Sequence, residues 1–405
     1  RIGSTEAATR DLGFTWDVDL EEGMRRLIAW RRDFHQHPEL GFQETRTSSI
    51  VAGHLNDLGI EVQQGVGRTG VVGIVDGAGD GPTVLLRFDM DALPIQEISD
   101  APYRSQHAGV MHACGHDGHT AIGLGVATLL SRQRQRLFGR VKLIFQPAEE
   151  GLGGAMAMIQ DGVLQQPAPD YAFGLHLWNQ LAFGQVAIQA GPLLAAADEF
   201  SLTIIGRGSH GAMPHEGIDA VVVAAQVVMA LQTIVSRLVD PTETAVLTIG
   251  TIHGGQAFNV LAGDVTMTGT VRTFDANIRQ QVWQGIETLV HGICQAYGAT
   301  FALQQAGCAA PATVNDPRAT ATMRQAAQAL ADATQVTPIK PLMIAEDMSE
   351  FLQRVPGCFA LLGAGPHPHP HHNAGFDFDE RALPVGVALL CETAALVLSQ
   401  PVNPG

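Results

Sequence analysis

The segment from His112 to His119 reads His-Ala-Cys-Gly-His-Asp-Gly-His and holds three imidazoles, a thiol and a carboxylate. Nitrogen and sulfur ligands of this kind suit a borderline-soft cation such as Zn²⁺, Mn²⁺, Co²⁺ or Ni²⁺. The glycines let the backbone turn, and Cys114 and His116 would share one face of an extended segment because they lie two residues apart. The pattern indicates a metal site, with a polar loop in a His-rich protein as the alternative.

A pair of adjacent carboxylates, Glu149 and Glu150, follows the apolar run Val141 to Phe145 and precedes a glycine-rich stretch. Adjacent side chains diverge, so one carboxylate can bind a metal while the other takes a proton from metal-activated water and delivers it to a leaving amine. Two exposed acids at a turn are the alternative. The buried strand expected before the pair favours the functional interpretation.

Two further carboxylates, Asp89 and Asp91, follow the apolar run Thr83 to Phe88. They could bind metal, or they could accept the outer N–H of a metal-binding histidine and fix its tautomer. We favour the second role for Asp91.

Two histidines outside the first motif are candidates for the same site. His176 follows the apolar run Tyr171 to Leu175, where a lone histidine is usually a satisfied core residue. His372 belongs to the His-rich loop Pro366 to Asn373, and it is the histidine of that loop that we expect to reach the site. The other histidines of the loop are interpreted as surface residues.

The elements before residue 191 indicate an α/β domain. The segment from Leu20 to Leu58 has helical periodicity that is interrupted at His37-Pro38, since proline disfavours helix in the residue before it. Short apolar runs then predict strands, and a helix is expected at 120–132, which together favour a mostly parallel central sheet flanked by helices. Chemistry in such sheets lies at the carboxyl ends of the strands, where the acidic pairs and His176 are found. The predicted strands are 71–75, 83–88, 141–145 and 171–175.

The pattern changes after Gly191-Pro192 to a β-α-β-β-α-β order, which is typical of a ferredoxin-like α+β fold. The chain then returns to α/β character, with a strand at 358–362. We therefore expect three segments: 1–191 and 304–405 as the two parts of a catalytic metal-binding domain, and 192–303 as an inserted domain. The strands and helices expected in the insert are 201–205, 220–238, 245–250, 264–272, 277–297 and 300–304.

Composition limits the possible partners. The 405 residues are 46% hydrophobic and carry a formal net charge of −16, which argues against nucleic acid and anionic membranes and favours a small ligand. Five cysteines at irregular spacing indicate reduced thiols and a cytoplasmic location. The apolar runs Ala220 to Val235 and Ala382 to Leu398 have the length of buried helices, so no membrane span is predicted. The polar segment Arg1 to Val18 is interpreted as a processed end or an appended segment.

Other catalytic motifs do not fit the sequence. Gly208-Ser209-His210-Gly211 is not a G-x-S-x-G nucleophile motif, and the chain has no Walker or dinucleotide-binding loop. Metal-activated water is the chemistry that remains.

The chain resembles the two-domain aminoacylase and carboxypeptidase metallohydrolases, in particular the hippurate hydrolases and indole-acetyl-amino-acid hydrolases. The likeness runs from about Ile28 to the C-terminus in matching order. It rests on the segments Arg87 to Pro94, Met111 to Thr120, Gln146 to Gly151, Gly174 to Asn179, Gly206 to Asp219 and His372 to Glu380.

The resemblance implies two divalent ions per chain (Zn, Mn, Co or Ni), with Glu149 as general base and acid and Cys114 as the bridging ligand. Asp91 supports this machinery. The metal ligands that the resemblance implies are Cys114, His116, Glu150, His176 and His372.

The resemblance also implies that the inserted domain closes over the substrate and forms a homodimer, with a tetramer as the alternative. His210 matches a residue that reaches the neighbouring subunit's site and stabilises the oxyanion, while Asn259 and Arg272 match residues that hold the substrate carboxylate. His119 and His215 are further candidates for supporting roles.

The expected function is hydrolysis of N-acyl-amino acids, either hippurate-like or aryl- or indole-acetyl conjugates. A dipeptidase or carboxypeptidase is the alternative within the same family, and it would be distinguished by a requirement for a free α-amine. A non-catalytic metal-binding or ligand-binding module would be expected to lose Glu149, which is present. Asp347-Met348-Ser349 replaces a segment that is more aromatic in relatives, which leaves the preferred acyl group open.

Overall fold

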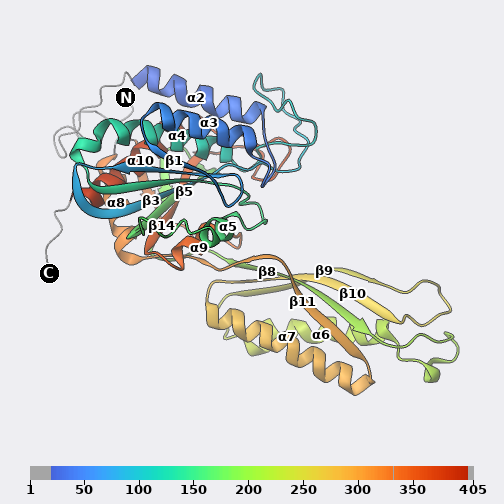
Figure 1. Ribbon diagram of the computed structural model, residues 1–405. Coiled ribbons are helices and arrows are strands. Elements are labelled where there is room, and N and C mark those ends of the chain that lie inside the picture. Colours follow the sequence, from blue (N-terminus) through green and yellow to red (C-terminus); the bar gives the residue numbers. More distant parts are fainter. Residues whose placement is uncertain (1–19, 332, 400–405) are drawn as a thin grey trace. The chain divides into compact units, whose positions relative to one another are not determined.

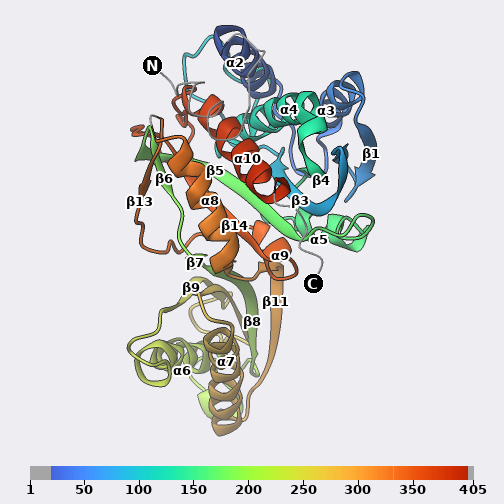
Figure 2. The same ribbon diagram turned by 90° about the vertical axis from the view of Figure 1, so that its left-hand side faces the viewer.

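The computed structural model describes residues 20–331 and 333–399 (Figures 1 and 2). The segment Arg1 to Val18 therefore lies outside the described residues. The chain divides into a first unit, made of 1–193, 314–340 and 347–405, and a second unit, made of 194–313 and 341–346. The boundary expected after residue 303 falls inside a strand, because β11 (Thr300–Ala310) pairs with β8 (Ala196–Ile205) as far as Ala310.

The first unit is built on an eight-stranded sheet in the order β1-β2-β4-β3-β5-β14-β6-β13. The four central strands, β4, β3, β5 and β14, are parallel to one another, and antiparallel pairings occur towards the edges. The central strands are almost continuously buried, as expected when helices cover both faces. Their bounds are β1 Glu61–Val66, β2 Gly70–Asp76, β3 Gly79–Asp89, β4 Phe138–Gln146, β5 Tyr171–Ala182, β6 Gln185–Ala187, β13 Gln335–Thr337 and β14 Gly357–Gly365.

Helices pack on both sides of this sheet. The helices α4 and α10 contact each other and strands β3, β4 and β5, while α2 packs on α4. In Figure 1, α2, α3 and α4 lie on one side of the sheet and α9 lies on the other. The mostly parallel, helix-flanked sheet predicted from the sequence is confirmed. The helices are α2 Leu20–Gln36, α3 Thr45–Asp57, α4 His116–Gln133, η1 Arg134–Arg136, α5 Gly154–Gln160, α8 Pro317–Ala329, α9 Met348–Leu352 and α10 Ala382–Leu398.

The second unit has the predicted ferredoxin-like order. Its antiparallel sheet runs β11-β8-β10-β9, and α6 and α7 pack together against it (Figure 1). Both helices begin at an aspartate, Asp219 or Asp275, whose carboxylate accepts the first free N–H groups of the helix. The remaining elements are β9 Ala245–Gly254, β10 Asp264–Thr273, α6 Ala220–Thr233, the π-turn η3 Ile234–Leu238, α7 Ala276–Tyr297 and the short η2 Pro214–Glu216; β7 Gly191–Leu194 pairs with β12 Thr313–Asn315.

The second unit contains a long apolar helical segment that starts with α6. Among the described residues, Ala220–Leu238 is the helix that is long and apolar enough to cross a membrane by length and composition. Val223, Val227 and Leu231 on this helix belong to the hydrophobic core of the second unit. A helix that covers a sheet has the same length and composition, and this packing is the one that the sequence pattern predicts for it.

Candidate metal centre

The first motif does not lie on a strand. Helix α4 begins at His116, and Gly115 before it has φ 97°. This left-handed conformation is open to glycine and turns the chain sharply between Cys114 and His116. The expectation that these two residues share one face of an extended segment is therefore wrong, and the turn is what brings both side chains to the same place.

His176 lies in the middle of β5, paired with Leu361 of β14, and not at the end of its strand as expected. The strand is longer than its apolar run because β14 continues to pair with it up to Ala182. The Nδ1 of His176 lies 2.8 Å from the main-chain oxygen of Leu177, which can only accept, so the ring proton is on Nδ1. The Nε2 lone pair faces the Sγ of Cys114 at 3.4 Å. Burial lowers the pKa of His176, which keeps the ring neutral and able to bind a metal.

His116 has the same tautomer for the same reason. Its Nδ1 lies 2.9 Å from the main-chain oxygen of Asp91, so its Nε2 lone pair is available. Burial opposes a charged His116 ring, but the Asp89, Asp91 and Glu150 carboxylates outweigh burial and raise the pKa of His116 to about 10. This surplus of negative charge around His116 would be compensated by a cation.

A second group of ligand atoms consists of Cys114, Glu150 and His372, all within 4.8 Å of one another. The Nε2 of His372 lies 3.3 Å from Oε2 of Glu150. The His372 N–H donates to the main-chain oxygen of Ala113 at 2.8 Å, and His372 has φ 61°, which is costly for a residue other than glycine. Its side chain is 54% exposed, so this end of the group is open to solvent.

Cys114 belongs to two groups of ligand atoms, one with His116 and His176 and the other with Glu150 and His372. This is the arrangement that a thiolate bridging two metal ions requires. Two buried atoms, Nε2 of His116 and Oε1 of Glu150, have no hydrogen-bond partner in the part of the chain that the structure describes. Because unpaired buried polar atoms are rare, the thiol, imidazole and carboxylate donors fit a pair of divalent ions.

A third group, Asp89, His116 and His119, also has metal-binding spacing, but Asp89 and His119 already have partners. His119 Nε2 accepts from the Leu177 N–H at 2.8 Å, and His119 Nδ1 lies 2.6 Å from Oδ1 of Asp89. Arg87 forms a buried ion pair with the other oxygen of Asp89. We therefore interpret His119 and Asp89 as supports for the Leu177 peptide, whose carbonyl orients His176. The sequence offered one signal for this, the position of His119 three residues after His116 on the same helix.

Asp91 and Glu149 both lie beside His116. One Asp91 oxygen lies 3.3 Å from His116 Nδ1, and the other accepts the Glu150 N–H at 3.0 Å. This geometry fits a supporting role for Asp91. Glu149 Oε2 lies 3.9 Å from His116 Nε2, too far for a hydrogen bond but near enough to face the same space.

Comparison with known proteins gives the family. Residues 85–396 match Peptidase family M20/M25/M40. The chain belongs to the M20 peptidase family. It is similar to the N-acetyl-L-cysteine deacetylase of Bacillus subtilis, with 40% identity over 94% of this chain and 90% of the relative. It is also 38% identical to the IAA-amino acid hydrolase ILR1-like 4 of Arabidopsis thaliana, over 92% of this chain and 86% of the relative.

A solved structure extends the comparison. The Bacillus subtilis YXEP protein, described as a dinuclear metal binding peptidase from the M20 family, has a TM-score of 0.83 and 34% identity over 94% of this chain and 100% of that chain. Membership of the M20 family makes this protein a hydrolase. The family resemblance inferred from the sequence is confirmed.

The second unit of this M20 hydrolase holds the remaining candidates at two places. His210 forms an isolated bridge with Val260, and Gly211 approaches Asn259 so closely that a Cβ on Gly211 would lie 2.9 Å from the Asn259 main chain. The Ala212 N–H donates to Nδ1 of His210 at 3.1 Å, so the ring proton is on Nε2, where it can be donated to a substrate. His210 and Asn259 are thus neighbours on an exposed surface.

Arg272 is far from that pair within the same unit. It faces Ala197 near one end of β10, whereas Asp264 at the other end faces Ile205, next to the loops of His210 and Asn259. Eight residues of strand separate the two ends, which corresponds to ~26 Å. The structure therefore does not bring Asn259 and Arg272 together within one chain.

Three other histidines, His371, His112 and His215, lie outside the two ligand groups that contain Cys114. His371, interpreted as a surface residue, stacks on Trp178 with a ring distance of 4.3 Å, and its Nε2 lies 3.0 Å from the Leu177 oxygen. Burial lowers the pKa of His371 to about 4. His112 is buried, with a pKa lowered by burial to about 4, and belongs to none of the ligand groups found among the described residues. His215 lies exposed in η2.

Asp347, considered above for its effect on acyl specificity, is held by hydrogen bonds within the first unit. Its carboxylate accepts from Arg87 at 2.9 Å, from Gln146 at 2.7 Å and from the Ala155 N–H at 3.0 Å. Asp347 and Asp89 thus share Arg87 as a partner in a buried polar network. A neutral aromatic residue at position 347 could not accept these hydrogen bonds.

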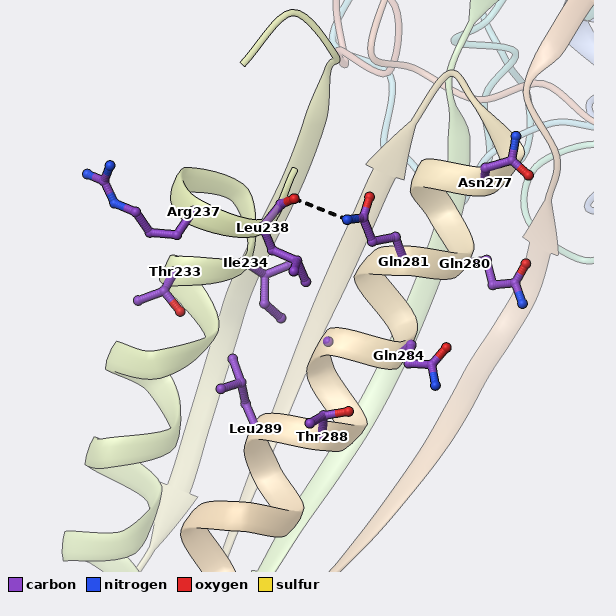
Figure 3. Close-up of a pocket in the computed structure, with 11 residues that line it drawn as sticks. Thr233, Ile234, Arg237, Leu238, Asn277, Gln280, Gln281, Gln284, Thr288 and Leu289 are labelled. Carbon is purple, nitrogen blue, oxygen red and sulfur yellow. Dashed lines mark hydrogen bonds between the residues drawn. The ribbon is translucent and has the colours of Figure 1, made fainter. Parts of the chain in front are cut away.

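A separate pocket of about 600 Å³ lies in the second unit between η3 and α7 (Figure 3). Its lining includes Arg237, Asn277 and Gln284, and Gln281 donates to the Leu238 main-chain oxygen at 3.1 Å across it. None of the candidate catalytic, metal or substrate residues lines this pocket.

Proposed function

We propose that this M20 hydrolase binds two divalent metal ions and cleaves the amide bond of N-acyl-amino acids. The observation that carries the proposal is the place of Cys114 in two ligand groups, with Glu149 beside His116, a member of the first group. The deacetylase and IAA-amino acid hydrolase relatives support an acyl group joined to an amino acid as the substrate. The residues that would hold the ions are Cys114, His116, Glu150, His176 and His372.

The chain's own residues would divide the work as follows. When bound, the ions polarise the amide carbonyl and make a water molecule more acidic. Glu149 takes the proton of the attacking water and returns it to the leaving nitrogen. Its carboxylate lies 3.9 Å from His116 Nε2, and, unlike Glu150, it is not grouped with Cys114 and His372. Asp91 keeps Glu150 in place through a carboxylate oxygen and His116 in place through its main-chain oxygen.

We further propose that the substrate is bound by two protomers of a homodimer. A substrate carboxylate held by Arg272 cannot also reach Asn259 of the same second unit, because ~26 Å of strand separates their positions. His210 and Asn259 would therefore serve the site of the neighbouring protomer. There His210 Nε2–H would donate to the oxygen that becomes negative in the transition state.

The surface of the second unit supports this assembly. Strand β9 is an edge strand whose residues 250–254 are exposed, and α6 beside it exposes Val221, Val222 and Met229. Phe258, next to Asn259, is fully exposed. Open strand edges and contiguous apolar side chains are typical of surfaces that a partner covers.

The free, buried cysteines support a reducing compartment, and we propose the cytoplasm. Cys294, Cys358 and Cys391 are buried and free. Burial raises the pKa of Cys358 to about 12, which makes that thiol unreactive.

The experiment that tests the proposed function combines a substrate panel with metal exchange. N-acetyl-, N-benzoyl- and indole-acetyl-amino acids and unblocked dipeptides would be offered to metal-free protein and to protein loaded with Mn²⁺, Zn²⁺, Co²⁺ or Ni²⁺. We expect hydrolysis of the N-acyl substrates only in the loaded protein. Hydrolysis confined to dipeptides with a free α-amine would favour the peptidase alternative, which the description of YXEP as a peptidase keeps open. Full activity without metal would exclude both.

A further inference from the structure

Glu44, to which no role has been assigned, is fully buried in the first unit. Glu44 precedes the first residue of α3 but does not cap that helix through its side chain. Its carboxylate instead crosses to the loop after β4, where Oε1 accepts the Ala148 N–H at 2.8 Å. Its other oxygen accepts the hydroxyl of Thr69. The carboxylate of Glu44 thus connects three segments of the chain, the start of α3, the loop of Thr69 and the loop after β4.

The residue that Glu44 holds has an unusual conformation. Ala148 has φ 52°, in the left-handed region that residues other than glycine rarely occupy. Its carbonyl accepts the Gly154 N–H at 3.0 Å, so both sides of Ala148 are hydrogen-bonded. Ala148 directly precedes Glu149, and a return of Ala148 to an ordinary φ would redirect the Glu149 side chain.

A matching contact lies on the other side of Glu149. The Glu150 N–H donates to Asp91 at 3.0 Å. Buried carboxylates thus hold the chain on both sides of Glu149: Glu44 binds the Pro147–Ala148 peptide before it, and Asp91 binds the Glu149–Glu150 peptide after it. This pair of contacts restrains the backbone on both sides of Glu149.

We infer that Glu44 is a positioning residue: its carboxylate holds the Ala148 peptide in the left-handed conformation and thereby aims Glu149 at the reacting groups. The inference rests on the proposed function of Glu149 as general base and acid. Glu44 itself contacts neither ligand group, so its effect on the reaction passes through the backbone of Ala148.

The test uses three variants of the full chain. Glu44→Leu keeps a side chain of similar size and removes both acceptor oxygens. Glu44→Gln is the conservative variant, because its amide oxygen can still accept from Ala148 while its NH₂ group donates to Thr69. Thr69→Val is the matched control, since it removes the Thr69 hydrogen bond to Glu44 and leaves the Ala148 bond intact.

The first readout is hydrogen exchange in metal-free protein, which is independent of activity. We expect exchange of the Ala148 amide to rise at least ~10-fold in Glu44→Leu, because the amide loses its acceptor, and to stay near wild type in the other two variants. The change should be confined to the peptide covering 146–152. Equal acceleration throughout the first unit, or in Thr69→Val as well, would show that Glu44 is only a stabilising residue.

The second readout is the split between kcat and KM at saturating metal. Glu44→Leu should lower kcat by ~10²-fold with little change in KM, since a displaced catalytic group costs about that much, and Glu44→Gln should recover most of the loss. An unchanged kcat in Glu44→Leu, with an active wild type, would overturn the inference. An inactive wild type would instead refute the proposed function, and the exchange experiment would still decide whether Glu44 holds Ala148.

Discussion

The candidate residues lie close together in the first unit of this M20 hydrolase and far apart in the second. The first unit brings side chains from the loop before α4, from β5, from the loop after β4 and from the His-rich loop within a few ångströms of one another. The second unit keeps His210 and Asn259 near one end of β10 and Arg272 near the other. A metal ion needs several ligands at about 2 Å from one centre, so the ligand side chains must lie close together. Substrate contacts have no such requirement and can be divided between protomers.

The largest effect is expected from a substitution of Cys114, which belongs to both ligand groups of the first unit. Cys114→Ser should lose both metal ions and ~10³-fold or more in activity, because the Lewis acid contributes several kcal/mol to the transition state. His372→Ala is the matched comparison, since His372 belongs to only one ligand group, and it should lose one ion. Elemental analysis after dialysis measures both. Retention of two ions by Cys114→Ser would mean that the thiol does not bridge them.

The adjacent glutamates distinguish binding from proton transfer within the same site. Glu149→Gln should retain metal and lose ~10²-fold or more in kcat, because proton transfer by a positioned group contributes about that much. Glu150→Gln should instead lower the metal content, since Glu150 lies with Cys114 and His372. Steady-state kinetics and metal analysis on the same preparations check this pair. The reverse pattern would exchange the two roles.

The separation in the second unit predicts complementation between inactive chains. His210→Ala should lose on the order of 10² in kcat, because one lost oxyanion donor costs about that much. Mixed with Glu149→Ala, it should recover roughly a quarter of wild-type activity, since half the dimers are mixed and each has one intact site. Native mass spectrometry would verify subunit exchange. Exchange without recovery would place His210 within its own chain's site or outside the reaction.

The smallest expected effect concerns Arg272. Arg272→Ala should raise KM ~10-fold or more for substrates with a free α-carboxylate. Hydrogen bonds to charged groups contribute about 1.5–3 kcal/mol, and the lower value corresponds to about a 10-fold change in binding. Amidated substrates should be affected little. Arg237→Ala is the control, because Arg237 is an exposed arginine of the same unit that lines the separate pocket. It should change KM for neither the carboxylate nor the amidated substrates. Equal losses on both substrate types would make Arg272 a structural residue.

The sequence alone determined which side chains could do the chemistry. Imidazole, thiol and carboxylate groups are recognisable wherever they occur, and the run from His112 to His119 is too dense in them to be missed. It also determined most of the elements, since buried parallel strands such as β3 and β4 contain short runs of mainly apolar residues. The ferredoxin-like order followed from the same local patterns.

The tertiary structure decided how those groups meet. The turn at Gly115, with φ 97°, placed His116 on a helix, and pairing with β14 extended β5 past His176; neither has a local apolar signal. Glu44 and Ala148 are 104 residues apart, so no spacing rule links them. Local periodicity reports which face of an element is buried. It carries no information on which distant backbone group a buried carboxylate will accept from, and that is settled only when the elements pack.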